Sequence, residues 1–247
     1  MKNKKKADNG EWIVEVAGIE KYFGNICVLE GIDLKVKKGE FLTIIGPNGA
    51  GKTTLLKILS TLMKPSSGEG KIVGFDLKQE EENLRREIGM LSHYTFLYEN
   101  LTAYENLKFY GRLYQVKNIE KEIKRVIEEV GLENRLHDTV RTLSRGMKQR
   151  LSIARSIIHN PSLLLLDEPY TGLDRWSGKK LKDILKRFHS RGKTIIMTTH
   201  NLSFSLELGD RVIILSSGKI VHEQPVAGIS LLELENLYPQ LEQRVRV

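Results

Sequence analysis

The sequence predicts an α/β fold with a mostly parallel sheet, an N-terminal antiparallel β-layer and an inserted helical lobe. Two short apolar runs without alternation, Phe41–Ile45 and Leu163–Leu166, are typical of strands buried on both faces of a parallel sheet. The first run is followed by a glycine-rich loop and then by apolar residues at helical spacing, from Leu55 to Met63. This order predicts a strand, a loop and a helix at the start of the parallel sheet.

The residues before the first buried strand predict the antiparallel layer. Glu11–Val16 is strand-like, and Ile32, Leu34 and Val36 alternate with polar residues up to a Lys-Gly turn. Such alternation indicates a sheet with one face on the core and the other in solvent.

The segment Gly46-Pro47-Asn48-Gly49-Ala50-Gly51-Lys52-Thr53-Thr54 fits the phosphate-binding pattern G-x-x-x-x-G-K-S/T. Its glycines let backbone N–H groups turn toward phosphate oxygens, and the N-terminal end of the next helix adds a positive potential. Lys52 is expected to reach the outer phosphates, and Thr53 to offer its hydroxyl to Mg²⁺. A chance glycine-rich turn is the alternative, but the strand before the loop and the helix after it favour the phosphate site.

The inserted lobe is predicted between about residues 91 and 160, where the apolar pattern becomes helical. Thr102 and Glu105 have the spacing of a capping box. One apolar stripe consists of Ile119, Ile123, Val126, Ile127 and Val130. After the lobe the parallel sheet resumes, and Val212–Val221 predicts a hairpin. A short amphipathic segment after His222 docks on the core or on a partner, and the core is the commoner choice.

The second buried strand ends in two carboxylates, Asp167 and Glu168. Ligands of open α/β sheets bind at the carboxyl ends of the strands. Asp167 is expected to hold Mg²⁺ through its water shell, and Glu168 to polarise the water that attacks a γ-phosphate. A solvated strand end is the alternative, and the phosphate loop upstream makes it the weaker one.

A second anion site is predicted in the segment Leu143-Ser144-Arg145-Gly146-Met147-Lys148-Gln149-Arg150. Ser144 is placed to cap the helix that follows, and the serine, the glycine and the first free amides of that helix together attract an anion. Because one chain already has its phosphate loop, the surplus site suggests a second nucleotide shared between two chains.

A further buried strand, Thr194–Thr199, leads into His200. Taken alone, a histidine at a strand end is more often structural, because a ring N–H can satisfy a neighbouring carbonyl. Beside the other three segments, a functional histidine is favoured.

Together these segments resemble the ATP-binding cassette (ABC) family over nearly the whole chain, from about residue 13 to residue 218. The resemblance implies a P-loop NTPase core that binds ATP and Mg²⁺, with Gly46–Thr54 as the Walker A loop and Asp167 and Glu168 at the end of the Walker B strand. The further matches that it implies are Ser144 and Gly146 in the signature, Gly172-Leu173-Asp174 as the D-loop, His200 as the switch histidine, and Phe23 as the aromatic residue that stacks on adenine.

Two regions depart from the family pattern. The signature has Arg145 and Met147 where the family has smaller or more polar groups, while Ser144 and Gly146 keep the γ-phosphate contact available. His93 occupies the position of the Q-loop glutamine, which in the family senses Mg²⁺ and the membrane partner. This change bears on metal sensing, because a neutral imidazole accepts a hydrogen bond whereas an imidazolium does not.

The segments Ser92–Tyr110 and Asp167–Asp174, with Ser-Arg-Gly-Met between them, resemble the haem-exporter ATPase of cytochrome c maturation. Related cassettes that export drugs, polysaccharides or antibiotics share much of these segments. The sequence therefore predicts an ATP-hydrolysing subunit for haem export or cytochrome c-type biogenesis, with a drug, polysaccharide or antibiotic exporter as the alternative.

The composition agrees with a single nucleotide-binding subunit, since the 247 residues are 40% hydrophobic and contain neither a second phosphate loop nor an apolar run of about 18 residues. The expected parts are a basic tail at 1–10, an ATPase domain at 11–221 and a C-terminal extension at 222–247. The basic start lacks a following apolar segment and is therefore not expected to be a signal peptide. The one cysteine, Cys27, excludes an internal disulfide and agrees with a reducing cytoplasm.

The net charge of +8 allows two interpretations, a nucleic acid or an anionic membrane surface. Lys and Arg are scattered among 31 acidic residues, so no nucleic-acid partner is predicted and the membrane surface fits better. The resemblance implies an ATP-bound, head-to-tail homodimer on the cytoplasmic face of the cell membrane that drives an integral membrane subunit. One rival function is a cassette that acts on ribosomes or DNA. The other is a nucleotide-dependent scaffold that hydrolyses nothing, and the presence of Glu168 and His200 argues against it.

Overall fold

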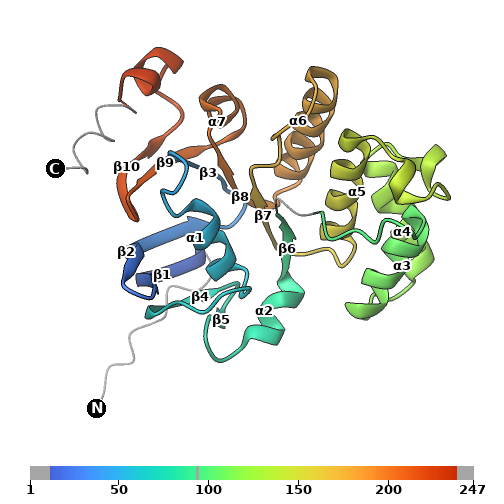
Figure 1. The fold of residues 1–247 in the computed structure, drawn as a ribbon, viewed down its shortest axis with the longest axis horizontal. Coiled ribbons are helices and arrows are strands. Elements are labelled where there is room, and N and C mark those ends of the chain that lie inside the picture. Colours follow the sequence, from blue (N-terminus) through green and yellow to red (C-terminus); the bar gives the residue numbers. More distant parts are fainter. Residues whose placement is uncertain (1–11, 93–94, 238–247) are drawn as a thin grey trace.

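The computed structural model describes residues 12–92 and 95–237, which form two sheets with helices packed around them (Figure 1). The larger sheet has five neighbouring parallel strands, and β10 joins its edge in the antiparallel direction. Its strands in spatial order are β10 (Lys219–Pro225), β9 (Arg211–Ser216), β3 (Phe41–Ile45), β8 (Thr194–Thr199), β7 (Leu163–Asp167) and β6 (Ile88–Leu91). The predicted, mostly parallel sheet is therefore confirmed.

The second sheet is the predicted antiparallel layer, drawn at the lower left of Figure 1. Its strands in spatial order are β2 (Ile26–Lys37), β1 (Trp12–Phe23), β4 (Ser67–Ile72) and β5 (Phe75–Asp76). The first strand is longer than the strand-like segment predicted from the sequence, because β1 continues past Val16 with irregular register against β2. Its far end carries Phe23 away from the core.

The helices follow the expected division between core and lobe. The core helices are α1 (Lys52–Leu59), α2 (Glu81–Glu87), α6 (Arg175–Ser190) and α7 (Leu202–Leu208). The helices between β6 and β7 are α3 (Ala103–Leu113), α4 (Ile119–Glu129), the short 3-10 turns η1 (Glu133–Arg135) and η2 (Val140–Thr142), and α5 (Arg145–Ile157). Figure 1 shows α3, α4 and α5 gathered on one side of the larger sheet, away from the antiparallel layer.

The ends of three helices test the sequence patterns directly. The capping box at the start of α3 is confirmed, since the Thr102 hydroxyl accepts the Glu105 N–H while the Glu105 carboxylate accepts the Thr102 N–H. Ser144 caps α5 as predicted, with its hydroxyl accepting the Met147 N–H. The helical pattern up to Met63 was too long, because α1 ends at Leu59 and Thr61 takes a left-handed φ of 61°.

The strand β7 explains why its four leucines show no alternation. Leu164 and Leu166 pack in one hydrophobic core, together with residues of α3, α4, α5 and α6. Leu163 and Leu165 pack in a second core, formed with the antiparallel layer and α1. Both faces of the strand are buried, so both sets of side chains must be apolar. The two cores hold the carboxyl end of β7 from opposite sides.

The segment after β10 returns to the core. Residues 231–237 are helical, and Leu234 is fully buried in a small cluster with Ile45, Val212 and Ile214. Docking on the core, the commoner of the two choices, is therefore observed for the described part of this segment. None of the helices within residues 12–92 and 95–237 has both the length and the apolar character needed to cross a bilayer.

Leu165→Ala is expected to lower the free energy of unfolding by about 2–5 kcal/mol, because the side chain is fully buried and leaves a cavity. Leu232→Ala is the matched control, since that leucine is 66% exposed and its loss should change the free energy by about 0.5 kcal/mol or less. Urea denaturation measures both. Equal losses for the two variants would contradict the assignment of β7 to the interior.

Candidate functional site

The glycine-rich loop joins β3 to α1 and is pressed against neighbouring strands. A Cβ added to Gly46 would lie 2.2 Å from the Leu215 carbonyl oxygen. A Cβ on Gly51 would lie 2.7 Å from a Leu29 methyl group, and the φ of Gly51 is 104°, a left-handed value that favours glycine. The middle of the loop, Asn48 and Gly49, is exposed, whereas Gly46, Ala50 and Gly51 are buried. The loop is therefore anchored at both ends and open at its centre.

Lys52, the first residue of α1, is buried beneath this loop. Its Nζ donates hydrogen bonds to the carbonyl oxygens of Gly46 at 2.6 Å and Pro47 at 3.0 Å, and it lies 3.8 Å from Glu168 Oε1. Burial lowers the pKa of the Lys52 ammonium, and the carboxylates of Glu168 and Asp167 oppose that effect. A further negative group beside Lys52 would stabilise its charged form in the same way.

Asp167 and Thr53 meet at the foot of the loop. The Thr53 hydroxyl lies 3.0 and 2.9 Å from the two Asp167 carboxylate oxygens, and the Asp167 side chain is almost fully buried. Within the described residues no group of three or more His, Cys, Asp or Glu side chains could hold a metal by itself. A hydroxyl and one carboxylate fit Mg²⁺, which prefers oxygen ligands and takes the rest of its shell from water and phosphate.

Glu168 and His200 face each other beside Lys52. Glu168 Oε2 lies 2.8 Å from His200 Nδ1, so the carboxylate is placed between the imidazole and the ammonium. The Glu168 backbone has a left-handed φ of 49°, which is unusual for this residue type. Such backbone strain occurs preferentially at functional sites and persists only where neighbours hold it. Here the Glu168 N–H donates to the Thr198 carbonyl oxygen at 3.1 Å.

Thr198 is a site residue that the sequence patterns did not single out. Its hydroxyl donates to Asp167 Oδ1 at 2.7 Å and accepts from the Glu168 N–H at 3.1 Å. It thereby fixes both carboxylate residues from the neighbouring strand β8. The signal available in the sequence is a polar residue inside an otherwise buried strand, because a buried hydroxyl requires a hydrogen-bond partner.

Phe23 lies at the end of β1 and is 46% exposed, with the Lys21 ammonium 5.3 Å from its ring centre. Part of the ring is therefore open to solvent, and its stacking on adenine stays a prediction. Of the remaining loop residues, Thr53 is exposed, while Pro47 and Thr54 are partly exposed.

The second predicted anion site forms a separate group. No hydrogen bond or ion pair between described residues joins Ser144, Gly146 or Asp174 to the loop 46–54. Asp174 instead caps α6, and hydrogen bonds from the Ser177 N–H and hydroxyl, followed by the Trp176 N–H, lower the pKa of its carboxyl group. Within one chain, therefore, the two predicted phosphate sites are not brought together.

His93 lies outside the described residues, so its contacts are not part of the site geometry. The segments on either side of it are tied to α5. The Ser152 hydroxyl donates to the Thr95 carbonyl oxygen at 2.8 Å, and the Arg155 guanidinium donates to the Met90 carbonyl oxygen at 2.7 Å.

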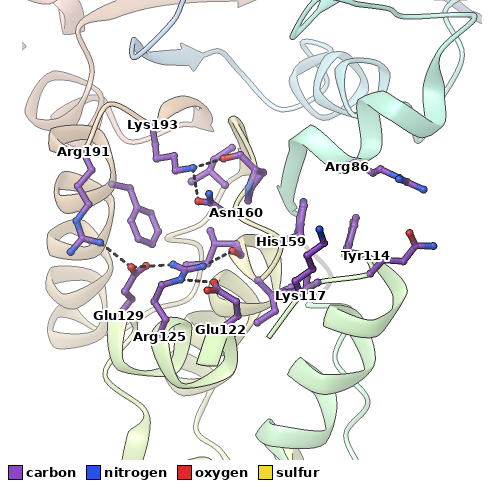
Figure 2. Close-up of a pocket in the computed structure, with 17 residues that line it drawn as sticks. Arg86, Tyr114, Lys117, Glu122, Arg125, Glu129, His159, Asn160, Arg191 and Lys193 are labelled. Carbon is purple, nitrogen blue, oxygen red and sulfur yellow. Dashed lines mark hydrogen bonds and ion pairs between the residues drawn. The ribbon is translucent and has the colours of Figure 1, made fainter. Parts of the chain in front are cut away.

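A cavity of about 600 Å³ lies away from the loop, between α3, α4, α5 and α6 (Figure 2). None of the predicted site residues lines it. On one side the rings of Tyr114 and His159 stack, with centres 3.8 Å apart, and His159 Nε2 lies 3.0 Å from the Ile88 carbonyl oxygen. On the other side Arg125 pairs with Glu122 and Glu129. Burial, helped by nearby cations, lowers the pKa of His159 to about 4.

The sequence of residues 29–171 matches the family model described as ABC transporter, which spans more than half of the chain. The chain belongs to the ABC transporter family. Its ATP-binding cassette has the loop, the strand-end carboxylates and the histidine described above, and it is an ATP hydrolase.

Individual ABC proteins support this assignment. The chain is 38% identical over 219 residues to the uncharacterized ABC transporter ATP-binding protein YdbJ of Bacillus subtilis (strain 168), covering 88% of this chain and 71% of that protein. It is 36% identical over 212 residues to the daunorubicin/doxorubicin resistance ATP-binding protein DrrA of Streptomyces peucetius, covering 85% of this chain and 64% of that protein.

A solved ABC structure agrees in fold. The dimeric post-hydrolysis state of the ATP-binding cassette MJ0796, bound to ADP and Pi, is similar with a TM-score of 0.79 and 30% identity, over 87% of this chain and 100% of that chain. The predicted fold class, a P-loop ABC ATPase core, is confirmed.

Lys52→Ala is expected to abolish the thermal stabilisation of this cassette by nucleotide, because the loop loses its cation. In the wild type, stabilisation should reach about 2.7 kcal/mol at a hundredfold excess of nucleotide over the dissociation constant. Thermal melts with and without Mg-ATP measure the shift. Lys57→Ala, on the same helix, is the control and should keep it. An undiminished melting shift with Mg-ATP in Lys52→Ala would contradict the role of Lys52 in nucleotide binding.

His159 predicts a pH dependence of stability. The unfolded chain takes up this proton near pH 6.5 and the folded chain only near pH 4, so the free energy of unfolding should fall as the pH is lowered through this window. The decrease in the free energy of unfolding that is attributable to His159 is on the order of 3 kcal/mol. Urea denaturation from pH 7 to pH 4 should show a shallower fall for His159→Phe than for the wild type. Parallel curves would contradict the burial of a neutral imidazole.

Proposed function

We propose that this chain is the ATP-hydrolysing subunit of an ABC exporter for drug-like or antibiotic-like molecules, working as a head-to-tail homodimer beneath a membrane subunit. The observation that carries the enzymatic part is the meeting of five side chains at the carboxyl ends of neighbouring parallel strands. These are Lys52, Thr53, Asp167, Glu168 and His200.

The chemistry follows from these groups. The ATP phosphates lie along the loop 46–54, and Lys52 exchanges its bonds to the Gly46 and Pro47 carbonyls for bonds to phosphate oxygens. Glu168 orients and polarises the attacking water, and His200 holds the γ-phosphate. Mg²⁺, held by Thr53 and Asp167, supplies positive charge to the phosphate oxygens when bound. Catalysis is mainly positioning and electrostatic stabilisation.

The homodimer is proposed because the Ser144 end of α5 has no contact with the loop in its own chain. Two chains in head-to-tail contact bring the Ser144 cap and Gly146 of one against the γ-phosphate held by the other. The free N–H groups at the start of α5 would then find a negative partner. The dimeric form of the similar MJ0796 cassette supports this arrangement.

An exposed aromatic patch supports a membrane subunit as partner. Four large side chains between residues 95 and 113 are 43–66% exposed. They are Phe96, Tyr98, Phe109 and Leu113. Tyr98 and Phe109 pack edge to face with ring centres 5.2 Å apart. Exposed apolar patches of this kind mark interaction sites, and a cytoplasmic helix of a membrane protein, at the cytoplasmic face of the cell membrane, is the proposed occupant.

The type of substrate rests on the relatives. DrrA is named for daunorubicin and doxorubicin resistance, which supports the exporter alternative derived from the sequence. Haem export remains the second candidate, because the Ser-Arg-Gly-Met signature and the segment Ser92–Tyr110 resemble that subfamily. No relative reported above carries the name of a haem exporter.

Transport assays separate these candidates. The chain would be expressed with the membrane protein that co-purifies with it, and cells would be tested for efflux of an anthracycline and for delivery of haem to cytochrome c. Efflux that requires Glu168 supports the drug exporter. Haem delivery supports the second candidate. Recovery of ribosomes or DNA in place of a membrane protein would favour the rival cytoplasmic function.

Glu168→Gln is expected to keep ATP binding but stall turnover, because the amide preserves shape and loses the charge that polarises water. Light scattering should show a dimer with Mg-ATP that a second change, Ser144→Arg, disrupts. Glu133→Gln, on the exposed turn η1, is the control and should hydrolyse ATP at the wild-type rate. A monomeric Glu168→Gln variant at saturating Mg-ATP argues against the shared-nucleotide dimer.

A further inference from the structure

Arg145, the first residue of α5, contacts the loop that follows β7, the strand that ends at Asp167. This loop, residues 169–174, runs from Glu168 to the N-cap of α6. One guanidinium nitrogen of Arg145, Nη2, donates a hydrogen bond to the Thr171 carbonyl oxygen at 2.9 Å. The Thr171 N–H in turn donates to the Glu168 carbonyl oxygen at 3.1 Å. Thr171 is therefore the one residue that links the Arg145 guanidinium to the backbone of Glu168.

The loop is shaped to receive this guanidinium. Gly172 has a left-handed φ of 72°, and a Cβ added there would lie 2.2 Å from Arg145 Cζ. A side chain at position 172 would occupy the space that the guanidinium fills. Arg145 and Gly172 are thus complementary: the loop closes on the arginine because its residue 172 has no side chain.

The same helix end makes a second hydrogen bond to this loop and also packs against α6. The Gln149 side-chain amide donates to the Pro169 carbonyl oxygen at 2.9 Å. Gly146 approaches α6 so closely that a Cβ on it would lie 2.2 Å from the Ser177 hydroxyl, which itself donates to Asp174. The start of α5 therefore holds the loop at Pro169 and Thr171, and it packs against Ser177, whose hydroxyl bonds to Asp174 at the end of the loop.

We propose that Arg145 is a positioning residue that fixes the 169–174 loop, and through it Glu168, to the Ser144 end of α5 in the same chain. The inference rests on the proposed function, in which Ser144 serves the partner's nucleotide and Glu168 the chain's own. With Arg145 in place, these two ends move as one body. When the Ser144 end closes on the nucleotide held by the partner, the same movement places the Glu168 carboxylate at the nucleotide held by its own chain.

The position of Arg145 predicts which kinetic constant changes. It makes no contact with the loop 46–54 of its own chain, so binding of the first ATP should not need it. Arg145→Ala is expected to lower kcat by about tenfold while KM for ATP stays within about twofold. Arg145→Lys should recover part of kcat, because an ammonium can still donate to the Thr171 carbonyl but lacks the planar fork.

The control is Arg141→Ala. Arg141 is exposed on η2, four residues before Arg145, and its side chain makes no hydrogen bond or ion pair with any other part of the described structure. This variant removes the same charge near the same helix end and should leave kcat unchanged.

Hydrogen exchange gives a readout that does not depend on turnover. In Arg145→Ala the amides of Thr171 and Leu173, which donate to the Glu168 and Tyr170 carbonyl oxygens, should exchange about tenfold faster, while those of β7 keep their wild-type rates. If the wild-type chain hydrolysed no ATP, the proposed function would fail, and this measurement would still decide whether Arg145 holds the loop.

A double-mutant cycle tests the partner residue. Gly172→Ala should lower kcat in the wild type, both by displacing Arg145 and by straining the backbone. In the Arg145→Ala background only the backbone strain remains. Gly172→Ala should therefore lower kcat by a smaller factor there than in the wild type, and the effects of the two substitutions on kcat should not add. Additive effects would overturn the proposal.

Two other results would also overturn it. If Arg145→Ala raises KM for ATP about tenfold with kcat unchanged, the arginine contacts a nucleotide and does not act by positioning. If both the exchange rates and kcat of Arg145→Ala equal those of the Arg141→Ala control, Arg145 has no role in holding the loop.

Discussion

The buried carboxylate of Asp167 is the constraint on which the rest of the site depends. A charge with almost no exposure must be compensated by hydrogen bonds, and Asp167 accepts them from Thr53 on α1 and Thr198 on β8. These bonds tie the start of α1 to two strands of the parallel sheet. Lys52 precedes Thr53, Glu168 follows Asp167 and His200 follows Thr198 by two residues, so fixing this one carboxylate also fixes the backbone beside Lys52, Glu168 and His200.

Packing on both faces of the sheet makes that placement rigid. The leucines of β7 alternate between the core shared with the lobe helices and the core shared with the antiparallel layer. The strand therefore cannot shift along either face without opening a cavity, which costs free energy in proportion to its volume. This rigidity is what allows Glu168 to keep a left-handed backbone and to lie between Lys52 and His200.

Two arginines of α5 hold segments on the lobe side of the larger sheet. Arg145 contacts the loop after β7, and Arg155 donates to the Met90 carbonyl oxygen of β6. The groups proposed for the chemistry thus lie at the carboxyl ends of the parallel strands, whereas these two contacts belong to α5.

The sequence by itself determined the buried strands Phe41–Ile45 and Leu163–Leu166, the glycine-rich loop, the capping box at Thr102 and the Ser144 cap, because each depends on residues close together in the chain whose pattern or hydrogen bonding is local. It also predicted Asp167, Glu168 and His200 as site residues from their places at strand ends, and the structure places Glu168 beside His200. Only the tertiary structure decided that α1 ends at Leu59, that Thr198 joins Asp167 to Glu168, and that Arg145 reaches Thr171. The last two contacts join residues more than twenty positions apart, and side-chain partners at that separation are set by how strands and helices pack, which no local pattern records.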